Sequence, residues 1–90
     1  MSVIIKQLTV NNKLGLHARP AALFVQIANK FEADITVKKD NETVNGKSIM
    51  GILMLAAEQG SQIEIRADGE DAQNAVDELE KLLLGQMDGV

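Results

Sequence analysis

The chain has 90 residues and a formal net charge of −4, with 13 acidic and 9 basic side chains and only two aromatic residues. This length fits a single domain, residues 1–90, and excludes a two-domain enzyme; an acidic chain with so few rings lacks the basic footprint and the stacking surface of a nucleic-acid-binding protein. Because the sequence has no cysteine, no apolar run long enough to span a membrane and no secretory leader pattern, we expect a cytoplasmic protein with neither disulfides nor a membrane partner.

The chain opens with a pattern typical of a strand that has one buried face. Residues 3–10 are mostly apolar or β-branched, and Leu8 and Val10 fall on one face while polar residues fall on the other. The polar tripeptide that follows, at 11–13, predicts a turn. We therefore expect the first strand to end at about Val10.

Pro20 marks the start of the first helix. Its fixed φ suits the first turn of a helix, where its missing N–H would have no partner in any case. Apolar residues with the spacing of an amphipathic helix follow, so the pattern predicts a helix that begins close to His17 and runs to about Asn29 or Lys30. The apolar positions of this helix are Pro20, Leu23, Phe24, Ile27, Ala28 and Phe31.

His17, the only histidine of the chain, is therefore predicted to stand at a helix N-terminus beside Arg19. Unpaired N–H groups and the positive end of the helix dipole attract anions there, and the planar guanidinium of Arg19 fits phosphate oxygens. Imidazole is a nucleophile near neutral pH, so this combination predicts a covalently held phosphoryl group. The plainer interpretation is that a lone histidine is only a surface residue or a cap, and Arg19 and Pro20 at this spacing weigh against it.

The middle of the chain predicts two strands and a short helix. Ile35 and Val37 alternate with polar residues as a second strand, a hairpin turn at 40–41 follows, and the third strand covers residues 42–44. Ser48 is a typical helix N-cap, so the strongly apolar residues from Ser48 to about Ala57 predict a second helix. We expect Gly60 to close this helix.

The last third of the chain predicts a strand and a long helix. In residues 62–66 isoleucines alternate with polar residues, which indicates a fourth strand with one wet face. From about Glu70 to Leu84 an apolar stripe follows helical spacing, with Glu70 and Asp71 in the first turn and Lys81 near the end. The stripe consists of Ala72, Ala75, Val76, Leu79, Leu82 and Leu83.

The predicted order of elements is βαββαβα. Strands with one apolar and one polar face need helices on one side only. The sequence therefore predicts an α+β fold of two layers, in which three helices cover one face of a four-stranded antiparallel sheet and the other face meets solvent.

The second helix carries more apolar side chains than it can bury. On the simplest interpretation Ser48 is only a cap and every apolar residue behind it belongs to the core. A helix of fewer than three turns that packs on one face cannot bury all of them, so some must form an exposed apolar patch. The residues concerned are Ile49, Met50, Ile52, Leu53, Met54 and Leu55.

Two separate motifs resemble one known family. The segment from Leu14 to Phe24 (LGLHARPAALF) and the segment from Val44 to Gly51 (VNGKSIMG) are similar to the histidine-containing phosphocarrier (HPr) family of the bacterial phosphoenolpyruvate-dependent sugar phosphotransferase system. The spacing between the motifs also fits, and the likeness runs from Ile5 to about Leu84. The resemblance implies an open-faced β-sandwich with strand order 1-4-2-3.

The resemblance also implies roles for particular residues. His17 would be phosphorylated on Nδ1, and Arg19 together with the backbone N–H groups of Ala18 and Arg19 would stabilise the phosphoryl group. The chain would accept that group from enzyme I, donate it to enzyme IIA domains, and act as a monomeric carrier that is not itself an enzyme. Ser48 would be a regulatory site for a dedicated kinase/phosphorylase, with a catabolite-control transcription factor as a further partner. Partner docking would fall to Ile49, Met50 and Leu53, and core packing to Ile52 and Leu55.

No cofactor or metal is expected. The sequence has no phosphate-binding loop of the Walker type and no carboxylate cluster suited to magnesium, so it should neither bind a nucleotide nor drive the transfer itself. Three alternatives stay open at this point. The chain could be a regulatory binding module that works through Ser48, a phosphocarrier of the nitrogen-related branch of the same system, or a structural domain in which His17 is incidental.

Overall fold

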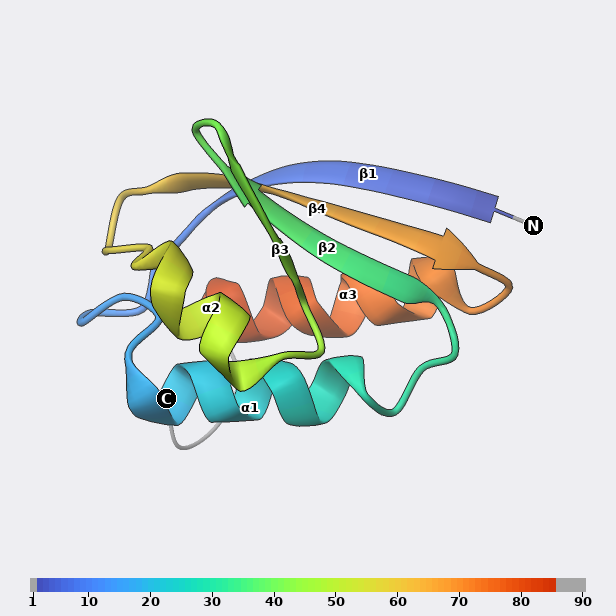
Figure 1. Cartoon of the computed structure of the whole chain (residues 1–90), viewed down its shortest axis with the longest axis horizontal. Helices are drawn as coiled ribbons and strands as arrows, with labels where there is room; N and C mark the ends of the chain where they lie inside the picture. The colour runs from blue at the N-terminus through green and yellow to red at the C-terminus, as the bar shows by residue number, and fades with distance from the viewer. Residues whose placement is uncertain (1, 86–90) are drawn as a thin grey trace.

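The computed structural model describes residues 2–85, which form four strands and three helices in the predicted order (Figure 1). The sheet order is β1-β4-β2-β3, and every neighbouring pair is antiparallel. The predicted α+β fold, its βαββαβα layout and its strand order are thereby confirmed. The elements are β1 (Ser2–Thr9), α1 (Ala18–Ala28), β2 (Asp34–Lys39), β3 (Glu42–Asn45), α2 (Ile49–Leu55), β4 (Gln62–Gly69) and α3 (Ala72–Leu83).

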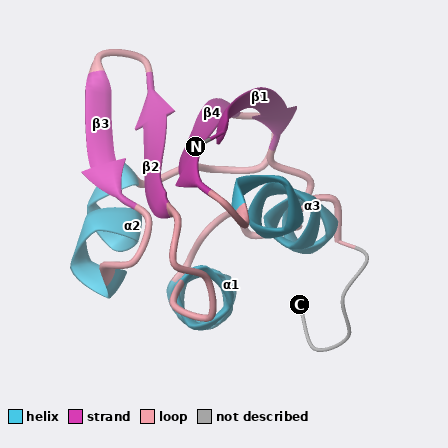
Figure 2. Ribbon diagram, turned by 90° about the vertical axis from the view of Figure 1, so that its right-hand side faces the viewer, coloured by secondary structure: helices cyan, strands magenta, loops and turns pink. Residues whose placement is uncertain are grey.

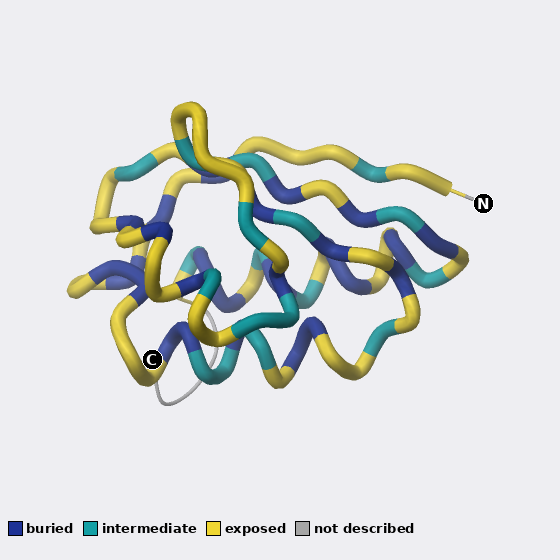
Figure 3. Tube along the Cα trace, in the orientation of Figure 1, coloured by how far each residue is buried: buried dark blue, intermediate teal, exposed yellow. Residues whose placement is uncertain are grey.

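All three helices lie against one face of the sheet, and the other face is open (Figure 2). Side chains alternate along each strand because successive Cβ atoms point to opposite faces. On β4, Ile63 and Ile65 are buried beneath the helices, whereas Gln62 and Arg66 are exposed. The alternation is visible as bands of buried and exposed residues along the trace in Figure 3.

The core lies between the sheet and the helices. Every residue of the stripe predicted on α3 is buried, which confirms the helical period found there. On α1 the buried set differs slightly from the predicted one, since Leu23 is only partly buried and Ala21 is fully buried. The helix ends at Ala28, a little earlier than predicted, so Phe31 lies beyond it and is only partly buried.

The end of α2 departs from the prediction. The helix stops at Leu55, and the residue that turns the chain is Ala56, in the left-handed region at φ 52°, ψ 44°. This turn directs Ala57 into the core, where it is 2% exposed and its carbonyl accepts the N–H of Leu16 at 2.8 Å. Gly60 therefore does not close the helix. Its φ of +89° belongs to the turn that leads into β4.

Asp71 also has a different role from the one expected. The helix α3 begins at Ala72, two residues later than predicted, so Glu70 and Asp71 precede it and are not in its first turn. The carboxylate of Asp71 accepts the backbone N–H groups of Glu32 and Ala33, both at 2.9 Å. These hydrogen bonds, led by the one from Glu32, hold the pKa of the Asp71 carboxyl below its usual range. The residue thus fastens the α1–β2 connection to the start of α3.

We expect Asp71→Asn to lower the melting temperature by several degrees at pH 7. The neutral amide has one acceptor oxygen and an NH2 group, so it cannot accept both N–H groups as the carboxylate does. A lowered pKa in the folded state means that the stabilisation is present above the pKa of the unfolded chain, about 3.9, and disappears as the pH falls through the folded value. The difference between variant and wild type should therefore shrink in acid, as measured by thermal melts at a series of pH values.

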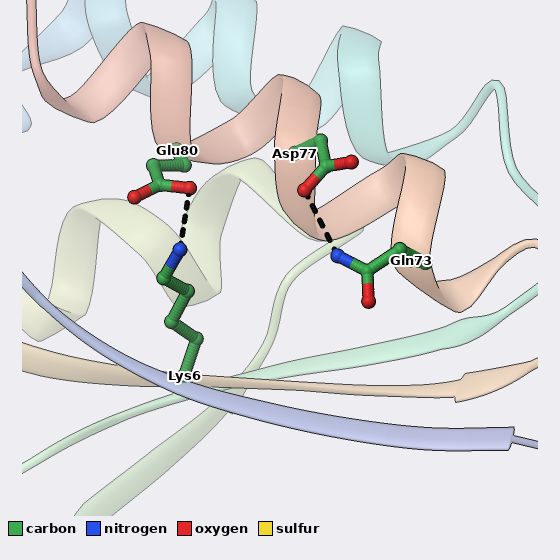
Figure 4. Close-up of polar contacts among 4 residues, drawn as sticks. All are labelled: Lys6, Gln73, Asp77 and Glu80. Atoms are coloured by element: carbon green, nitrogen blue, oxygen red, sulfur yellow. Dashed lines mark hydrogen bonds and ion pairs between the residues drawn. The ribbon is translucent and has the colours of Figure 1, made fainter.

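Asp77 provides the matched control for this prediction. It lies on the exposed side of α3, near the ion pair between Lys6 and Glu80 (Figure 4). Among the described residues its carboxylate accepts one side-chain donor, Gln73 Nε2, at 2.9 Å. Such exposed pairs contribute little, so Asp77→Asn should melt as the wild type does. Equal melting temperatures for Asp71→Asn and Asp77→Asn at pH 7 would contradict the role of Asp71.

Candidate functional site

His17 is the residue from which α1 starts. Its backbone is extended, at φ −82° and ψ −166°, and its carbonyl accepts the N–H of Ala21 at 2.9 Å. Pro20 is the third helical residue and lies in the first turn, as predicted. Among residues 2–85 the imidazole makes no capping hydrogen bond, and His17 is exposed. The ring is therefore free to react with a group that arrives from solvent.

The first turn of α1 offers backbone donors beside the imidazole. The N–H groups of Ala18 and Arg19 precede the first intrahelical hydrogen bond, which begins at Ala21. They also lie at the positive end of the helix dipole, where an anion is favoured. The two predicted backbone donors and the predicted nucleophile thus share one helix end.

A shallow depression in front of this helix end contains His17 and Arg19 together. Its lining includes two cationic side chains, Lys13 and Arg19, and no carboxylate. The guanidinium of Arg19 is planar and presents several donors, which suits it to the oxygens of a phosphoryl group. The residues that line this depression, called the His17 depression below, are Asn12, Lys13, Leu14, His17, Ala18, Arg19 and Pro20.

A second depression connects His17 to α2. Leu53 of α2 lines it together with Leu14 and His17, and its lining includes one carboxylate, Glu58. Ile49, Met50 and Leu53 are 38%, 63% and 39% exposed and are named the α2 patch here, while Ile52 and Leu55 are buried. The expected division of this helix into a core face and an exposed apolar face is present, and the apolar face adjoins the histidine.

Two further apolar residues are exposed: Leu14, which was not predicted, and Met54, which was among the α2 residues expected to include exposed ones but was assigned to neither face. Leu14 is 74% exposed in the loop before His17, and Met54 is 68% exposed on α2. Met54 is four residues after Met50, so a helical projection of α2 could have placed it on the exposed face. Leu14 has no such periodic signal, because it lies in a loop.

Ser48 caps α2 as predicted. Its Oγ accepts the N–H of Gly51 at 3.1 Å, and the residue is half-buried. The preceding Lys47 is tied to the connection between α1 and β2, since its Nζ donates to the carbonyl of Phe31 at 2.7 Å. The serine therefore lies on a segment that is fixed at both sides.

Asn12 is a buried polar residue of the site that sequence reasoning did not single out. It is 5% exposed, its Nδ2 donates to the carbonyl of Leu82 at 3.1 Å, and it lines the His17 depression. Among the described residues its Oδ1 has no hydrogen-bond partner. A buried acceptor without a partner lowers the stability of the folded state by about 1–3 kcal/mol. The position of Asn12 is therefore not explained by stability alone.

The opposite end of the molecule is acidic. In Figure 1 the start of α1 is at the left of the long axis, whereas β2 begins and β4 ends at the right. A depression at that far end is lined by Glu32, Asp34, Asp68, Glu70 and Asp71 with Gly69 and Asn74. Within residues 2–85 no group of three or more acidic, histidine or cysteine side chains is arranged to hold a metal ion. None of the described helices combines the length and hydropathy needed to cross a membrane.

Comparison with known proteins gives concordant matches. A family model described as the PTS HPr component phosphorylation site covers residues 4–84. The phosphocarrier protein HPr of Xylella fastidiosa (strain Temecula1) is 50% identical over 76 residues, which are 84% of this chain and 85% of that protein. A crystal structure of HPr from Bacillus anthracis superposes with a TM-score of 0.88 at 51% identity, covering 92% of this chain and 99% of the other.

A regulatory relative is similar to the same extent. The HPr-like protein Crh of Bacillus subtilis is 49% identical over 74 residues, which are 82% of this chain and 87% of Crh. A crystal structure of Crh, described as a catabolite repression protein in an intertwined, domain-swapped dimer, superposes with a TM-score of 0.75 at 44% identity and covers 91% of this chain and 94% of the other.

Proposed function

The chain belongs to the HPr family of phosphocarrier proteins, and from this premise we propose that it accepts a phosphoryl group on His17 from phosphorylated enzyme I and donates it to enzyme IIA domains of sugar transporters. The observation that carries the proposal is the exposed imidazole at the N-terminus of α1, which makes no capping hydrogen bond within residues 2–85 and shares the His17 depression with Arg19. A nucleophile, a guanidinium and free backbone N–H groups at one helix end support a covalently held phosphoryl group there.

The transfer is a substitution at phosphorus. The lone pair of His17 Nδ1 attacks the phosphorus atom, the N–P bond forms as the bond between phosphorus and the donor breaks, and the ring proton stays on Nε2. Negative charge on the three phosphoryl oxygens is stabilised by the guanidinium of Arg19 and by the N–H groups of Ala18 and Arg19. Donation to an enzyme IIA domain is the same step in reverse, with the acceptor as the nucleophile.

The α2 patch is the proposed docking surface. An adaptable methionine between two aliphatic side chains suits a surface that meets several partners in turn. Because one chain supplies both His17 and the α2 patch, we propose a cytoplasmic monomer as the working form. It needs no cofactor or metal and has no turnover of its own, since the driving force comes from the phosphorylated donor.

Labelling tests the proposal. The chain incubated with enzyme I and phosphoenolpyruvate carrying labelled phosphate should gain one phosphoryl group that is stable in base and labile in acid, as a phosphohistidine is. Replacing enzyme I with its nitrogen-branch counterpart shows which branch the chain serves. A wild-type protein that stays unlabelled with both donors would overturn the carrier function.

A second candidate function, regulation through Ser48, is favoured by the similarity to Crh, whose structure is described as that of a catabolite repression protein. A dedicated kinase/phosphorylase would modify Ser48, and the modified chain would bind a catabolite-control transcription factor. Ser48 lies directly before the α2 patch, so its modification changes the surface proposed for docking. The two functions are compatible in one chain.

Phosphorylation of Ser48 should weaken transfer through His17 without a change of fold. The phosphate adds about −1.5 to −2 charges at the edge of the α2 patch, where it opposes an acidic partner or one that must desolvate the patch. The KM for transfer should rise at low salt and recover partly at high salt, as measured by kinetics at several ionic strengths. Ser48→Ala should transfer normally and lose roughly 0.5–2 kcal/mol of stability with its cap. A rate defect that salt leaves unchanged would contradict the electrostatic explanation.

A further inference from the structure

The segment that leads to His17 is fixed to the far end of another helix. The last carbonyls of a helix lack the usual intrahelical partners, and two adjacent asparagines donate to three carbonyls at the end of α3. One of these three, Leu82 O, also accepts the backbone N–H of Gly85 at 3.1 Å. Leu82 O accepts Asn12 Nδ2 at 3.1 Å, Leu83 O accepts the backbone N–H of Asn11 at 2.8 Å, and Leu84 O accepts Asn11 Nδ2 at 3.3 Å. The loop between β1 and α1 is thereby held against the C-terminus of α3.

From Asn12 onward the path to His17 has little freedom. The carbonyl of Asn12 accepts the N–H of Gly15 at 2.9 Å, and Leu16 N–H donates to Ala57 O at 2.8 Å. Gly15 has a φ of +71°, and a Cβ there would meet the backbone of Ala57. Since Gly15 is bonded to Asn12 and Leu16 to Ala57, we expect a movement of Asn12 to change the position of His17.

Asn12 and Asn11 differ in their surroundings although both donate to α3. Asn12 is 5% exposed and lines the His17 depression, while Asn11 is exposed, and its side-chain bond adds to a backbone bond that any residue would make. The hydrogen bond to Leu82 O is made only when the NH2 group of Asn12 faces that carbonyl, so the amide is assigned in this orientation. The Oδ1 atom then points to the other side, where it has no hydrogen-bond partner among residues 2–85. The Asn12 side chain therefore acts through its NH2 group, which donates to Leu82 O.

We propose that Asn12 is a positioning residue for phosphoryl transfer: by donating to Leu82 O it holds the loop that carries His17, so that the imidazole and the donors of α1 keep the geometry of transfer. This inference rests on the phosphocarrier function proposed above. Asn12 does not touch the phosphoryl group. It acts through the loop, with α3 as the support.

The effect should fall on kcat and spare KM. An error of about 1 Å in the position of a reacting group lowers a rate by roughly a hundredfold. Binding of a partner, in contrast, depends on the α2 patch, and no residue of that patch belongs to the segment from Asn11 to Leu16. A purely stabilising role would instead leave both constants unchanged for every molecule that is folded.

The test compares Asn12→Ala with the matched control Asn11→Ala as phosphoryl acceptors from phosphorylated enzyme I. Both are assayed in the full chain, at a temperature where circular dichroism shows each to be folded. We expect Asn12→Ala to lose about tenfold or more in kcat, with KM within about twofold of wild type, and Asn11→Ala to keep both constants. In the unphosphorylated protein the ring signals of His17 in NMR spectra should shift or broaden for Asn12→Ala alone.

Asn12→Gln keeps the proposal testable if the alanine variant does not fold. It retains the carboxamide on a side chain one methylene longer, so a positioning role predicts a lower kcat in a folded protein. A folded Asn12→Ala or Asn12→Gln with the kcat of wild type would overturn the inference, and so would an equal loss in Asn11→Ala. Failure of the wild type to accept a phosphoryl group is a separate outcome, which removes the carrier function itself.

Discussion

Replacing His17 with alanine should reduce phosphorylation by enzyme I to background and leave the melting temperature of the protein unchanged. No other histidine exists in the sequence to take over as a nucleophile. The melting temperature should stay the same because the imidazole is exposed. Within the described chain it makes no capping hydrogen bond whose loss would weaken α1. Labelling with phosphoenolpyruvate and enzyme I, together with a thermal melt, measures both effects.

Gln26→Ala is a suitable control for this experiment. Gln26 is an exposed residue on the same helix, two turns beyond the site, so its replacement should affect neither labelling nor melting. Label that persists on His17→Ala would assign the phosphoryl group to a different residue. A large drop in melting temperature would show instead that the imidazole has a structural role.

Met50→Glu should produce the second large effect, a KM for transfer that rises by about tenfold or more. Met50 is the most exposed residue of the α2 patch, at 63%, and truncating or charging a central contact of an interface typically costs about 2 kcal/mol or more of binding, which exceeds tenfold. The His17 depression contains no residue of α2. The rate at saturating partner should therefore stay close to that of wild type.

Ile5→Glu separates docking from a general effect of added charge. Ile5 is 57% exposed, which is close to the exposure of Met50, but it lies on β1, on the open face of the sheet. This variant should transfer with the wild-type KM. If saturating partner fails to restore the rate of Met50→Glu, the residue contributes to the transfer step and is more than a docking contact.

The parts of the fold that sequence predicted well are those with a strong local period. The apolar stripe of α3 and the alternation along β4 were both found where the pattern placed them, because each element buries one face against a single partner layer. The predicted end of α2 was wrong because the chain turns there for a tertiary reason and not for a local one. The need to bring Ala57 into the core forces Ala56 into a left-handed conformation that a glycine ordinarily adopts.

The site divides in the same way. His17, Arg19 and Pro20 lie within four residues of one another, so a local motif was enough to bring them to one helix end. Asn12 matters through Leu82, which is 70 residues away in the sequence. The role of Asp71 depends on Glu32 and Ala33, which are 39 and 38 residues away in the sequence. These long-range hydrogen bonds form only when the helices are packed, so the pattern of residues within one segment cannot predict them.

The depressions at the two ends of this protein are lined by charges of opposite sign, so a partner meets a different electrostatic field at each end. Charges in physiological salt are screened over about 8 Å, whereas the molecule is 34 Å long. A protein that approaches the start of α1 therefore experiences two cations, Lys13 and Arg19, against one nearby carboxylate, Glu58. The acidic side chains at the far end are largely screened from it. The overall charge of −4 is a poor guide to which surfaces attract it. An anionic protein can in this way present a cationic front to an acidic partner, and its orientation on approach is set before any contact is made.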